Sequence, residues 1–477
     1  MITNSDFPIR WYYGHRDAVS AMAKWLANSY LEPVGWKHVE NMVDAGNGRQ
    51  AGSENERIAA EDTRDVYEDV GVRDVEIQEF NFQGWSRNKS EVLAGKNGDV
   101  YHAFALPRSP AGEASGELVD IGHAMPADFE ENDVDGKVVI AASNVPEGHY
   151  SRSLHRIEKY HYAIRNGAAA FILYNHIPGT VIRSGAIRGL KGAPIGEIPV
   201  VGASYEIGRK LIRRHLGEEV TVDVDVNIGP GTSQNVVGQL GPDTDEFVIV
   251  SSHIDGHDVG ESAGDNAAGT GVAVEVARIL AQREDELDIG LRFVGFGAEE
   301  EGFVGSGYFL NSIDREAVKA IIQNDGVARA RDIKIHTNRF EGFEPAIEHV
   351  RDTYTDPVHA TVEMTLGSDH WRFLEVGVPS IDVASQPVDL RGEPAYGSNS
   401  GITVTEADTF DKLDPRDLRN HAIIEAELVR YIASDDFAIA HRTEDEIREL
   451  VAEEGKTGMA EGLQINGKEG GIETPAW

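Results

Sequence analysis

Residues 246–297 read EFVIVSSHIDGHDVGESAGDNAAGTGVAVEVARILAQREDELDIGLRFVGFG, and their pattern indicates the fold most clearly. It opens with an apolar, β-branched run at 247–250, which is typical of a strand buried on both faces. Residues 267–282 then read as a helix, and 291–297 form a second short apolar run. We therefore expect a strand, a loop, a helix and another strand, the unit from which parallel sheets are built.

The same alternation continues toward the C-terminus. KAIIQND (319–325) and VPSIDVA (378–384) are two further apolar runs, FVGSGYFL (303–310) begins a helix, and another helix is predicted from about 415 to 433. This pattern predicts an α/β fold in which a mixed central sheet is sandwiched by helices. In such folds ligands bind beyond the carboxyl ends of the strands, so the polar residues that follow the strands are the first candidates for a site.

The N-terminal region has a different pattern. Residues from about 12 to 70 place apolar side chains at helical spacing, and they predict helices. VRDVEIQEF (72–80) and SEVLAG (90–95) follow as two predicted strands.

The region up to about residue 230 is rich in short strands. It has its own alternation of strands and turns around one helix near 153–166, which predicts a separate small domain. We expect the Gly/Pro/Ser stretch IGPGTSQN (228–235) to be the linker that ends this domain. The strand-like runs are SGELVDIG (115–122), GKVVIAAS (136–143) and EIPVVGAS (197–204).

The chain carries a large excess of acidic residues. Asp and Glu number 81 against 44 Lys and Arg, and the formal net charge is -37. The acid is spread along the whole sequence, as on a solvated surface rather than in a tail. We interpret it as adaptation to high salt, where ions screen the self-repulsion; an ordinary acidic cytosolic protein is the alternative. Such a field repels nucleic acid and anionic membranes, so we expect neither as a partner.

The sequence contains no cysteine. This excludes disulfides, thiolate zinc ligands and a cysteine nucleophile, so any metal must be held by His, Asp and Glu. MITNSDFPIRWYYGHRD (1–17) lacks the basic region and the apolar run of a signal peptide. The most apolar stretch, GAAAFILY (167–174), is too short to span a bilayer. We therefore expect a soluble cytoplasmic protein.

Several polar side chains stand at the ends of the expected strands or in the loops that follow them. Taken singly, each has an ordinary explanation, such as a helix N-cap, a turn or a solvated charge run. Such placements at successive strand ends are much harder to explain by coincidence. The residues are His253, Asp255, Asp265, Glu299, Glu300 and Asp325.

This set of residues suits a pair of divalent metal ions. Imidazole and carboxylates are ligands of such ions, and one carboxylate can bridge two of them. Two ions about 3.5–4 Å apart would lower the pKa of a bound water toward about 7. A free carboxylate beside them would take the proton of that water, which is worth roughly 10²–10⁴ in rate. Adjacent Glu299 and Glu300 can supply one ligand and one base, because successive residues project in different directions.

Longer motifs in the chain resemble a known family, the zinc exopeptidases of metallopeptidase family 28. This family includes bacterial leucyl aminopeptidases and plasma glutamate carboxypeptidase. Residues 115–228 resemble the protease-associated domain that is inserted in many members. The motifs are GNGRQAGSENERIAA (46–60), NVVGQL (235–240), HIDGHDVGESAGDNAAGTG (253–271), FVGFGAEEEGFVGSGYF (293–309), QNDG (323–326), SDHWRF (368–373) and EADTFDKLDPRDL (406–418).

The resemblance covers nearly everything but the C-terminal tail, and it implies the zinc exopeptidase fold and a division into four parts. Residues 1–112 would be the N-terminal part of the peptidase domain, and 113–228 the protease-associated-like insertion. Residues 229–440 would be the metallopeptidase catalytic domain. Residues 441–477 would form a C-terminal helix and a mobile tail.

The resemblance also implies a role for each site residue. His253 and Asp325 would be terminal ligands of one metal, and Asp265 would bridge the two metals. Glu300 would bind the second metal, and Glu299 would be the general base.

Two further features are implied by the resemblance. Asp255 would hold the ring of His253 through its second nitrogen, as carboxylates beside metal-bound histidines do. The peptide bond between Asp265 and Asn266 would be cis.

One ligand of the family is missing from this chain. The family's last ligand is the His of a His-Thr-x-x-Asp-Thr motif, which here reads VTEADT, so the ligand position is Val404. No His lies between His370 and His421, and His370 corresponds to a family position that is not a ligand. We therefore expect zinc with up to two ions, and a weak second site completed by water or a nearby oxygen such as that of Glu406.

Three functions follow from these predictions. The first is an exopeptidase that acts on peptides, with cleavage at the amino end favoured over the carboxyl end. The second is a weakened or non-catalytic relative used for binding or assembly, which Val404 favours. The third is a single-zinc enzyme similar to glutaminyl cyclase, although such relatives use the metal position that is damaged here. A homo-oligomer is left open, and we expect the protease-associated-like segment to be a lid or an interaction module.

Overall fold

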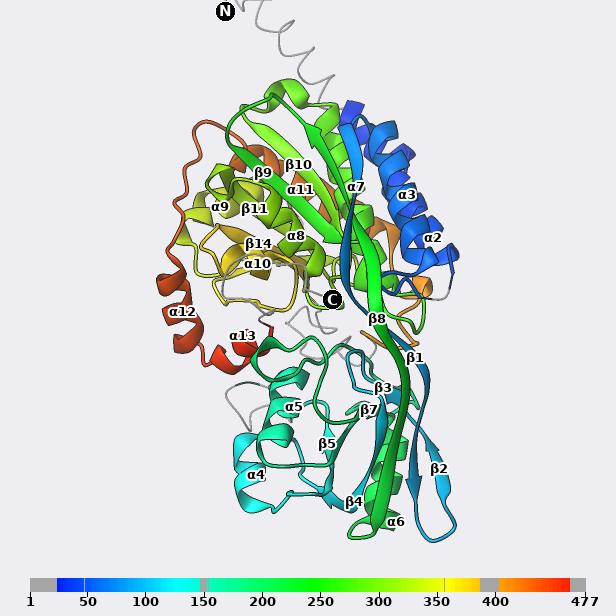
Figure 1. Ribbon diagram of the computed structural model, residues 1–477. Coiled ribbons are helices and arrows are strands. Elements are labelled where there is room, and N and C mark those ends of the chain that lie inside the picture. Colours follow the sequence, from blue (N-terminus) through cyan, green and yellow to red (C-terminus); the bar gives the residue numbers. More distant parts are fainter. Residues whose placement is uncertain are drawn as a thin grey trace, which may run out of the picture.

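A computed structural model describes residues 24–46, 48–145, 152, 154–355, 357–386 and 403–463. These residues form two bodies, a larger one drawn above a smaller one in Figure 1. Two long strands, β1 (Arg73–Ala94) and β8 (Glu219–Leu240), pair along their length and run through both bodies. The two bodies are therefore joined by a shared antiparallel ribbon.

The sheet of the larger body has the strand order β13-β12-β14-β11-β9-β10-β8, with β1 beside β8. The central strands β14, β11, β9 and β10 are parallel to one another. In contrast, β12 runs antiparallel to β14 and β8 antiparallel to β10, so the sheet is mixed, as predicted. The strands are β9 (Phe247–His253), β10 (Gly290–Phe296), β11 (Val318–Asn324), β12 (Asp332–His336), β13 (Val358–Thr361) and β14 (Ser380–Gln386).

Helices cover both faces of this sheet. Strand β9 shows the reason, because Val248 and Val250 pack into the core under α7, whereas Phe247 and Ile249 pack into the core under α8 and α10. The helices on the α7 side are α2 (Val34–Asp44), α3 (Glu54–Val70), α7 (Ala268–Ala281), α9 (Glu344–Thr353) and α11 (Pro415–Ile432). Those on the other side are α8 (Val304–Ser312) and α10 (His370–Leu374).

The smaller body is the predicted β-rich insertion. Its parallel strands β4 to β7 follow β8 in the order β8-β4-β5-β6-β7-β3, and the predicted helix near 153–166 is α5. The strands are β2 (Asp99–His102), β3 (Phe104–Ala105), β4 (Gly112–Asp120), β5 (Val138–Ala142), β6 (Ala170–Tyr174) and β7 (Val200–Ala203). The helices are α4 (Pro126–Glu131), α5 (Arg156–Arg165) and α6 (Tyr205–His215).

The predicted linker at 228–235 is wrong. These residues lie inside β8, where Pro230 is aligned with Gln83 of β1. On its other edge β8 pairs with β4 only as far as Val224, and with β10 only from Val236 onward. A proline, which has no backbone N–H, is tolerated in a strand that is paired on one side only. The turn-forming composition of this stretch therefore reflects a half-paired strand rather than a loop.

The core of the smaller body includes residues from before position 113. Trp85, Val92 and Tyr101 pack with Leu118 and Ile140 in one buried cluster. The second half of β1 therefore belongs to the smaller body by its packing. The two strands predicted at 72–80 and 90–95 form this single strand.

The C-terminal part described here has two helices, α12 (Glu444–Glu453) and α13 (Thr457–Leu463), where the sequence predicted one. Helix α13 contacts α5, so the chain returns to the smaller body (Figure 1). The predicted tail, and the predicted helical residues before position 24, lie outside the described residues. In the part of the chain that the structure describes, no helix has the length and apolar character needed to cross a membrane.

Candidate metal centre

The carboxyl ends of three neighbouring parallel strands bring the predicted residues together. His253 is the last residue of β9, and Asp325 directly follows β11. Glu299 and Glu300 lie in the loop after β10, which pairs with β9 on its other side. Because the strands are parallel and in register, their ends meet at one edge of the sheet.

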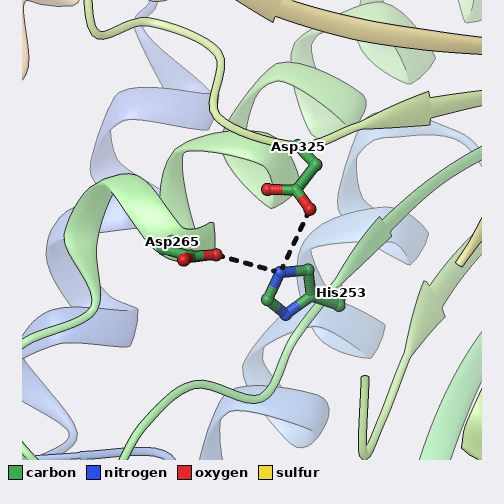
Figure 2. Close-up of side chains that lie close together, drawn as sticks. All are labelled: His253, Asp265 and Asp325. Carbon is green, nitrogen blue, oxygen red and sulfur yellow. Dashed lines mark ion pairs between the residues drawn. The ribbon is translucent and has the colours of Figure 1, made fainter. Parts of the chain in front are cut away.

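One ring nitrogen of His253 faces two carboxylates. Its Nε2 lies 3.3 Å from Oδ1 of Asp265 and 3.9 Å from Oδ2 of Asp325, as Figure 2 shows. The imidazole is fully buried, and neither ring nitrogen has a hydrogen bond of normal geometry. An ion among these three donor atoms would satisfy all of them, so the arrangement fits a metal ligand set.

The electrostatics of the cluster also fit a cation. Burial lowers the pKa of His253, but the charge of Glu299, contacts with Asp255 and Asp265 and the charge of Asp325 together raise it well above its ordinary value. Burial, followed by the charge of Asp265, raises the pKa of Asp325 to about 7. Several carboxylates gathered in a buried place are costly unless positive charge accompanies them.

Asp255 connects the ring of His253 to the loop after β10. Its Oδ1 lies 3.3 Å from Nδ1 of His253. Its two oxygens accept hydrogen bonds from the backbone N–H groups of Glu299 and Glu300, each at 3.1 Å. The fully buried Asp255 thus holds both a donor ring and the two glutamates in place.

Asp265 lies in a short π-helical turn, Ala263–Ala267, at the start of α7. The peptide bond between Asp265 and Asn266 is cis, which confirms the prediction. The carboxylate of Asp408 accepts hydrogen bonds from the backbone N–H groups of Gly264 at 3.0 Å and Asp265 at 2.9 Å. Asp408, which belongs to the motif EADTFDKLDPRDL (406–418), thus positions the turn that carries Asp265.

Glu299 and Glu300 point to different partners. Oε1 of Glu300 lies 2.8 Å from Nε2 of His257. Glu299 is buried, and its pKa is raised well above its ordinary value, chiefly by burial and also by the charges of Glu300 and Asp369, against the opposing charge of His253. A carboxylate with raised proton affinity beside the donor atoms has the property that a general base needs.

In the part of the chain that the structure describes, three groups of three residues each offer donor atoms that lie within 4.8 Å of one another. We call His253, Asp265 and Asp325 the first donor set, and His257, Asp265 and Glu300 the second donor set. His253, Glu299 and Glu300 form the remaining group. Asp265 belongs to both named sets.

His257 is a site residue that the sequence did not predict. It lies four residues after His253 in HIDGHD, and its side chain is only 3% exposed. No histidine lies between His370 and His421, the segment around Val404, so that segment predicts no replacement ligand. The signal that could have found His257 is a second histidine in the loop after β9, where ligands of this fold gather.

Val404 lies at the same cavity as the donor sets and is 5% exposed. Its φ angle is 57°, in the left-handed region that β-branched residues rarely adopt. Its carbonyl accepts a hydrogen bond of 2.8 Å from the backbone N–H of Ser184 in the smaller body. The Val404 side chain has no lone pair, so the family's last ligand is absent at this position.

The donor atoms open into a cavity of about 940 Å³ between the two bodies. Asp265, Glu299, Glu300 and Asp325 line it on the side of the larger body. On the side of the smaller body it is lined by basic side chains, which include Arg156, Arg183 and Arg188. A cavity of this size with metal donors at its base is suited to a small substrate.

Buried imidazole and carboxylate donors at the ends of parallel strands are typical of hydrolases that activate water with metal ions. The class is narrowed further by sequence comparison. Residues 235–429 match the model of peptidase family M28, and residues 114–211 match the PA domain. The matches thus identify an M28 peptidase domain and, before it, a PA domain within this chain.

Curated relatives are aminopeptidases by name. Aminopeptidase YwaD of Bacillus subtilis is 27% identical over 337 residues, which are 68% of this chain and 69% of the relative. The probable leucine aminopeptidase 2 of Aspergillus oryzae is 28% identical over 317 residues, or 62% of this chain and 60% of the relative. Aminopeptidase Y of Saccharomyces cerevisiae is 25% identical over 71% of this chain and 65% of the relative. The matched region thus spans about two thirds of these relatives or less.

Solved structures share the fold. A peptidase M28 precursor from Shewanella amazonensis has a TM-score of 0.71 at 19% identity, covering 89% of this chain and 99% of that one. BSAP, described as a zinc aminopeptidase from Bacillus subtilis, has a TM-score of 0.65 at 23% identity, covering 83% and 93%. The zinc exopeptidase fold that the sequence predicted is therefore confirmed.

Proposed function

We propose that this chain is a metal-dependent exopeptidase that removes one residue from the amino end of peptides. The observation that carries the proposal is the pair of donor sets sharing Asp265, with Glu299 beside them at the base of a cavity. The names of the relatives support cleavage at the amino end over the carboxyl end.

Zinc is the metal that we propose. The donors are imidazole and carboxylate groups, which are common zinc ligands, and BSAP is described as a zinc enzyme. The first donor set would hold one ion, and Asp265 and Glu300 would contribute to a second. The sequence predicts that this second position is weak, because Val404 offers no donor; that prediction counted only two protein ligands and did not include His257.

The mechanism assigns separate tasks to the residues of the chain. Metal held by the two donor sets would supply a water of lowered pKa and would polarise the carbonyl of the scissile bond. Glu299 accepts the proton of the attacking water and returns it to the leaving amine. Asp255 keeps the ring of His253 in one orientation, and it fixes the loop that carries Glu299 through the backbone N–H group.

The test is hydrolysis of a panel of amino-acyl and peptide substrates by protein of known metal content. We expect release of amino-terminal residues, loss of turnover after treatment with a chelator, and recovery when zinc is added back. Blocking the amino terminus of a good substrate should abolish its cleavage. Cleavage that ignores the blocking group, or that survives complete metal removal, would overturn the proposal.

A second candidate is a weakened or non-catalytic relative used for binding or assembly, and Val404 is the observation that favours it. The same panel separates the two, because this candidate predicts peptide binding without turnover in protein that is fully loaded with metal. A peptide with an amino-terminal glutamine in the panel tests the third predicted function, a single-zinc cyclase.

We also propose that the acidic surface is an adaptation to salt. With a net charge of -37, self-repulsion in the folded state falls as ionic strength rises. The melting temperature should therefore increase between low and molar sodium chloride. A flat or falling melting temperature would leave the ordinary acidic protein as the better description. The cytoplasmic location and the oligomeric state stay predictions.

A further inference from the structure

We infer that His257 is a metal ligand in this chain, and that it replaces the imidazole that the family supplies at position 404. This inference rests on the proposed function, because it completes the second of two metal positions at the proposed site. It changes the expected second site from two protein ligands to three.

The first argument is geometric. Nε2 of His257 lies 2.8 Å from Oε1 of Glu300, and one donor atom of each of these two residues lies within 4.8 Å of a carboxylate oxygen of Asp265. Neither Nε2 of His257 nor Oε1 of Glu300 forms a hydrogen bond of normal geometry, although both are buried. Two such atoms that approach without aligning as donor and acceptor are placed to share a cation.

The second argument is that the loop carrying His257 is held in place. The guanidinium group of the fully buried Arg49 donates hydrogen bonds to the carbonyls of Ile254, Glu261 and Ser262, which lie on both sides of His257. The backbone N–H of His257 itself donates to Oγ of Ser262 at 3.0 Å. Ligands that are fixed before the metal arrives lose little entropy on binding it.

The neighbour of His257 is held as well. Asp258 forms an ion pair of 2.6 Å with Arg87 of β1, and both side chains are largely buried. The loop is therefore held both by Arg49 and by Arg87 of β1.

The third argument is the position of the loop relative to Val404. The carbonyl oxygen of Thr405 lies only 2.9 Å from where a Cβ of Gly260 would stand, so the two segments pack directly against each other. A donor lost from the segment that contains Val404 can therefore be supplied by the loop that contains His257, without a large movement of either. The second donor set then has the same composition as the first, one imidazole and two carboxylates, which suits zinc.

The alternative is that His257 is only an ion-pair partner of Glu300. Metal binding distinguishes the two, and it does so without any assay of turnover. Unmodified protein, His257→Ala and the double variant His257→Ala/Val404→His are loaded with zinc, dialysed against metal-free buffer and measured for metal per chain. Titration calorimetry gives the two affinities, and the visible spectrum of the cobalt-loaded proteins reports the ligands.

We expect two retained ions in the unmodified protein and one in His257→Ala, with affinity for the second ion lower by at least about 100-fold. The double variant should recover the second ion, because it returns an imidazole from position 404. His359→Ala is the matched control, since His359 lines the same cavity, pairs with Asp332 at 3.0 Å and belongs to none of the donor groups.

The inference is overturned if His257→Ala keeps two ions with unchanged affinity and spectrum, or if the unmodified protein retains only one. Melting curves and the intact first site in His257→Ala show whether that variant is folded, and His257→Gln provides a milder substitution if it is not. Two retained ions in a protein without peptidase activity would support the inference while contradicting the proposed function.

A second inference rests on a different observation, the basic wall of the cavity. Arg156 and Arg183 of the smaller body both line the cavity opposite the donor sets. Arg183 makes no ion pair in the part of the chain that the structure describes, and there Arg156 hydrogen-bonds only the carbonyl of Ala186, at 2.7 Å. In a chain with a net charge of -37, two arginines without an ion pair among the described residues indicate a binding site for a negatively charged group.

The negative charges that act on these arginines belong to the metal centre. The charges of Glu300, Glu299 and Asp265 raise the pKa of Arg156 against the larger lowering by burial, and Asp265 acts in the same way on Arg183. When these carboxylates bind metal, their charge is taken up by the ions. The arginines then face the cavity without a fixed counter-charge.

We infer that Arg156 and Arg183 bind a carboxylate of the substrate next to the scissile bond. A guanidinium group binds a carboxylate through two parallel hydrogen bonds, which favours this ligand over other anions of a peptide. The carboxylate has two sources, the α-carboxylate of a dipeptide or the side chain of Asp or Glu in the second residue. This inference rests on the proposed function and defines its substrate class as short or acidic peptides.

The test compares Leu-Ala, Leu-Ala-amide and Leu-Glu-amide in the unmodified protein, in Arg183→Gln and in the control Arg213→Gln, whose side chain is exposed on α6. We expect KM for the carboxylate substrate to be lower than for Leu-Ala-amide by about tenfold or more, as one charge-assisted hydrogen bond provides. Arg183→Gln should remove this difference, because it should raise KM for the carboxylate substrate much more than KM for Leu-Ala-amide.

The substrates distinguish the two sources of the carboxylate. A low KM for Leu-Ala indicates the α-carboxylate, and a low KM for Leu-Glu-amide indicates the side chain. Equal KM values for all three substrates, or a loss in Arg183→Gln that is the same for the amide, would overturn the inference. If no substrate is cleaved, calorimetry of the same three ligands with metal-loaded protein still measures the preference directly, and only the proposed function fails.

Discussion

The first and second donor sets contain the same kinds of atoms, but the chain builds them in different ways. In the first set, His253 and Asp325 stand at the ends of adjacent parallel strands, so the register of the sheet fixes their separation. In the second set, His257 lies in the loop after β9 and Glu300 in the loop after β10. Hydrogen bonds from residues far away in sequence, above all from Arg49, hold the His257 loop.

This difference explains why the second donor set can exchange one ligand for another, whereas the first cannot. A donor at the end of a central strand cannot move unless the sheet moves, whereas a donor in a loop can be lost from one segment and supplied by another that packs against it. Val404 and His257 lie in two such segments. Asp265 belongs to both sets, and its turn is anchored by Asp408 rather than by a strand.

The largest effect is expected where the two sets meet. Asp265→Asn keeps the shape of the side chain but removes the charge that two bound ions would share, so both should be lost on dialysis. Peptidase activity should then fall to the background of the assay. Metal analysis after dialysis checks the prediction, and a melting curve controls for folding. One tightly held ion in Asp265→Asn would mean that the carboxylate serves a single site.

Glu299→Gln should lower the rate of hydrolysis without changing metal binding by either donor set. The amide cannot accept the proton of the attacking water, so we expect kcat to fall by at least about 100-fold. Metal content should remain that of the unmodified protein. Steady-state kinetics and metal analysis on the same samples provide the check. Full turnover would show that Glu299 is not the base, and loss of an ion would place Glu299 among the ligands.

Most of the fold could be predicted from the sequence because strong local patterns produce it. The apolar runs that became β9, β10, β11 and β14 are buried strands of ordinary length, and α7 and α11 have clear helical spacing. The sequence did not predict β12 and β13, whose runs DIKIH and VHAT are short and mixed in polarity. Residues 228–235 were misjudged because Gly and Pro indicate turns, whereas pairing with β1 makes them a strand.

The same difference between strand ends and loops separates the site residues that could be predicted from the sequence from the one that could not. His253, Asp325, Glu299 and Glu300 could be predicted because they follow apolar strands, and parallel strands bring such residues together. His257 could not be predicted in this way, because the conformation of its loop depends on contacts with Arg49 and with β1. A pattern of residues along one segment does not contain those contacts.

Arg49→Lys should weaken the second donor set selectively. Lysine keeps the positive charge but cannot donate to three carbonyls in the fixed geometry of a guanidinium group, so the loop that carries His257 should loosen. We expect affinity for the second ion to fall by about tenfold while the first stays unchanged, in the range seen when groups that support metal ligands are altered. Calorimetric titration of zinc into metal-free protein measures both steps. Equal losses at both sites would show that Arg49 supports the whole centre rather than this loop.

The smallest effect is expected from Val404→His in the otherwise unmodified protein. From the sequence alone, this substitution should raise both metal occupancy and rate, because it returns the ligand that the family uses. With His257 already in the second donor set, the added imidazole finds a position that has its three protein ligands, so occupancy and kcat should change by less than about twofold. The backbone gives no reason for a loss of stability, since Val404 has a φ angle of 57° and an unbranched Cβ is better tolerated there than a β-branched one. Metal analysis, kinetics and a melting curve of the two proteins side by side check this, and Val404→Leu controls for the change in side-chain size. A clear rise in occupancy and rate with His but not with Leu would show that the second set is incomplete, and that the centre contains one strong and one weak site.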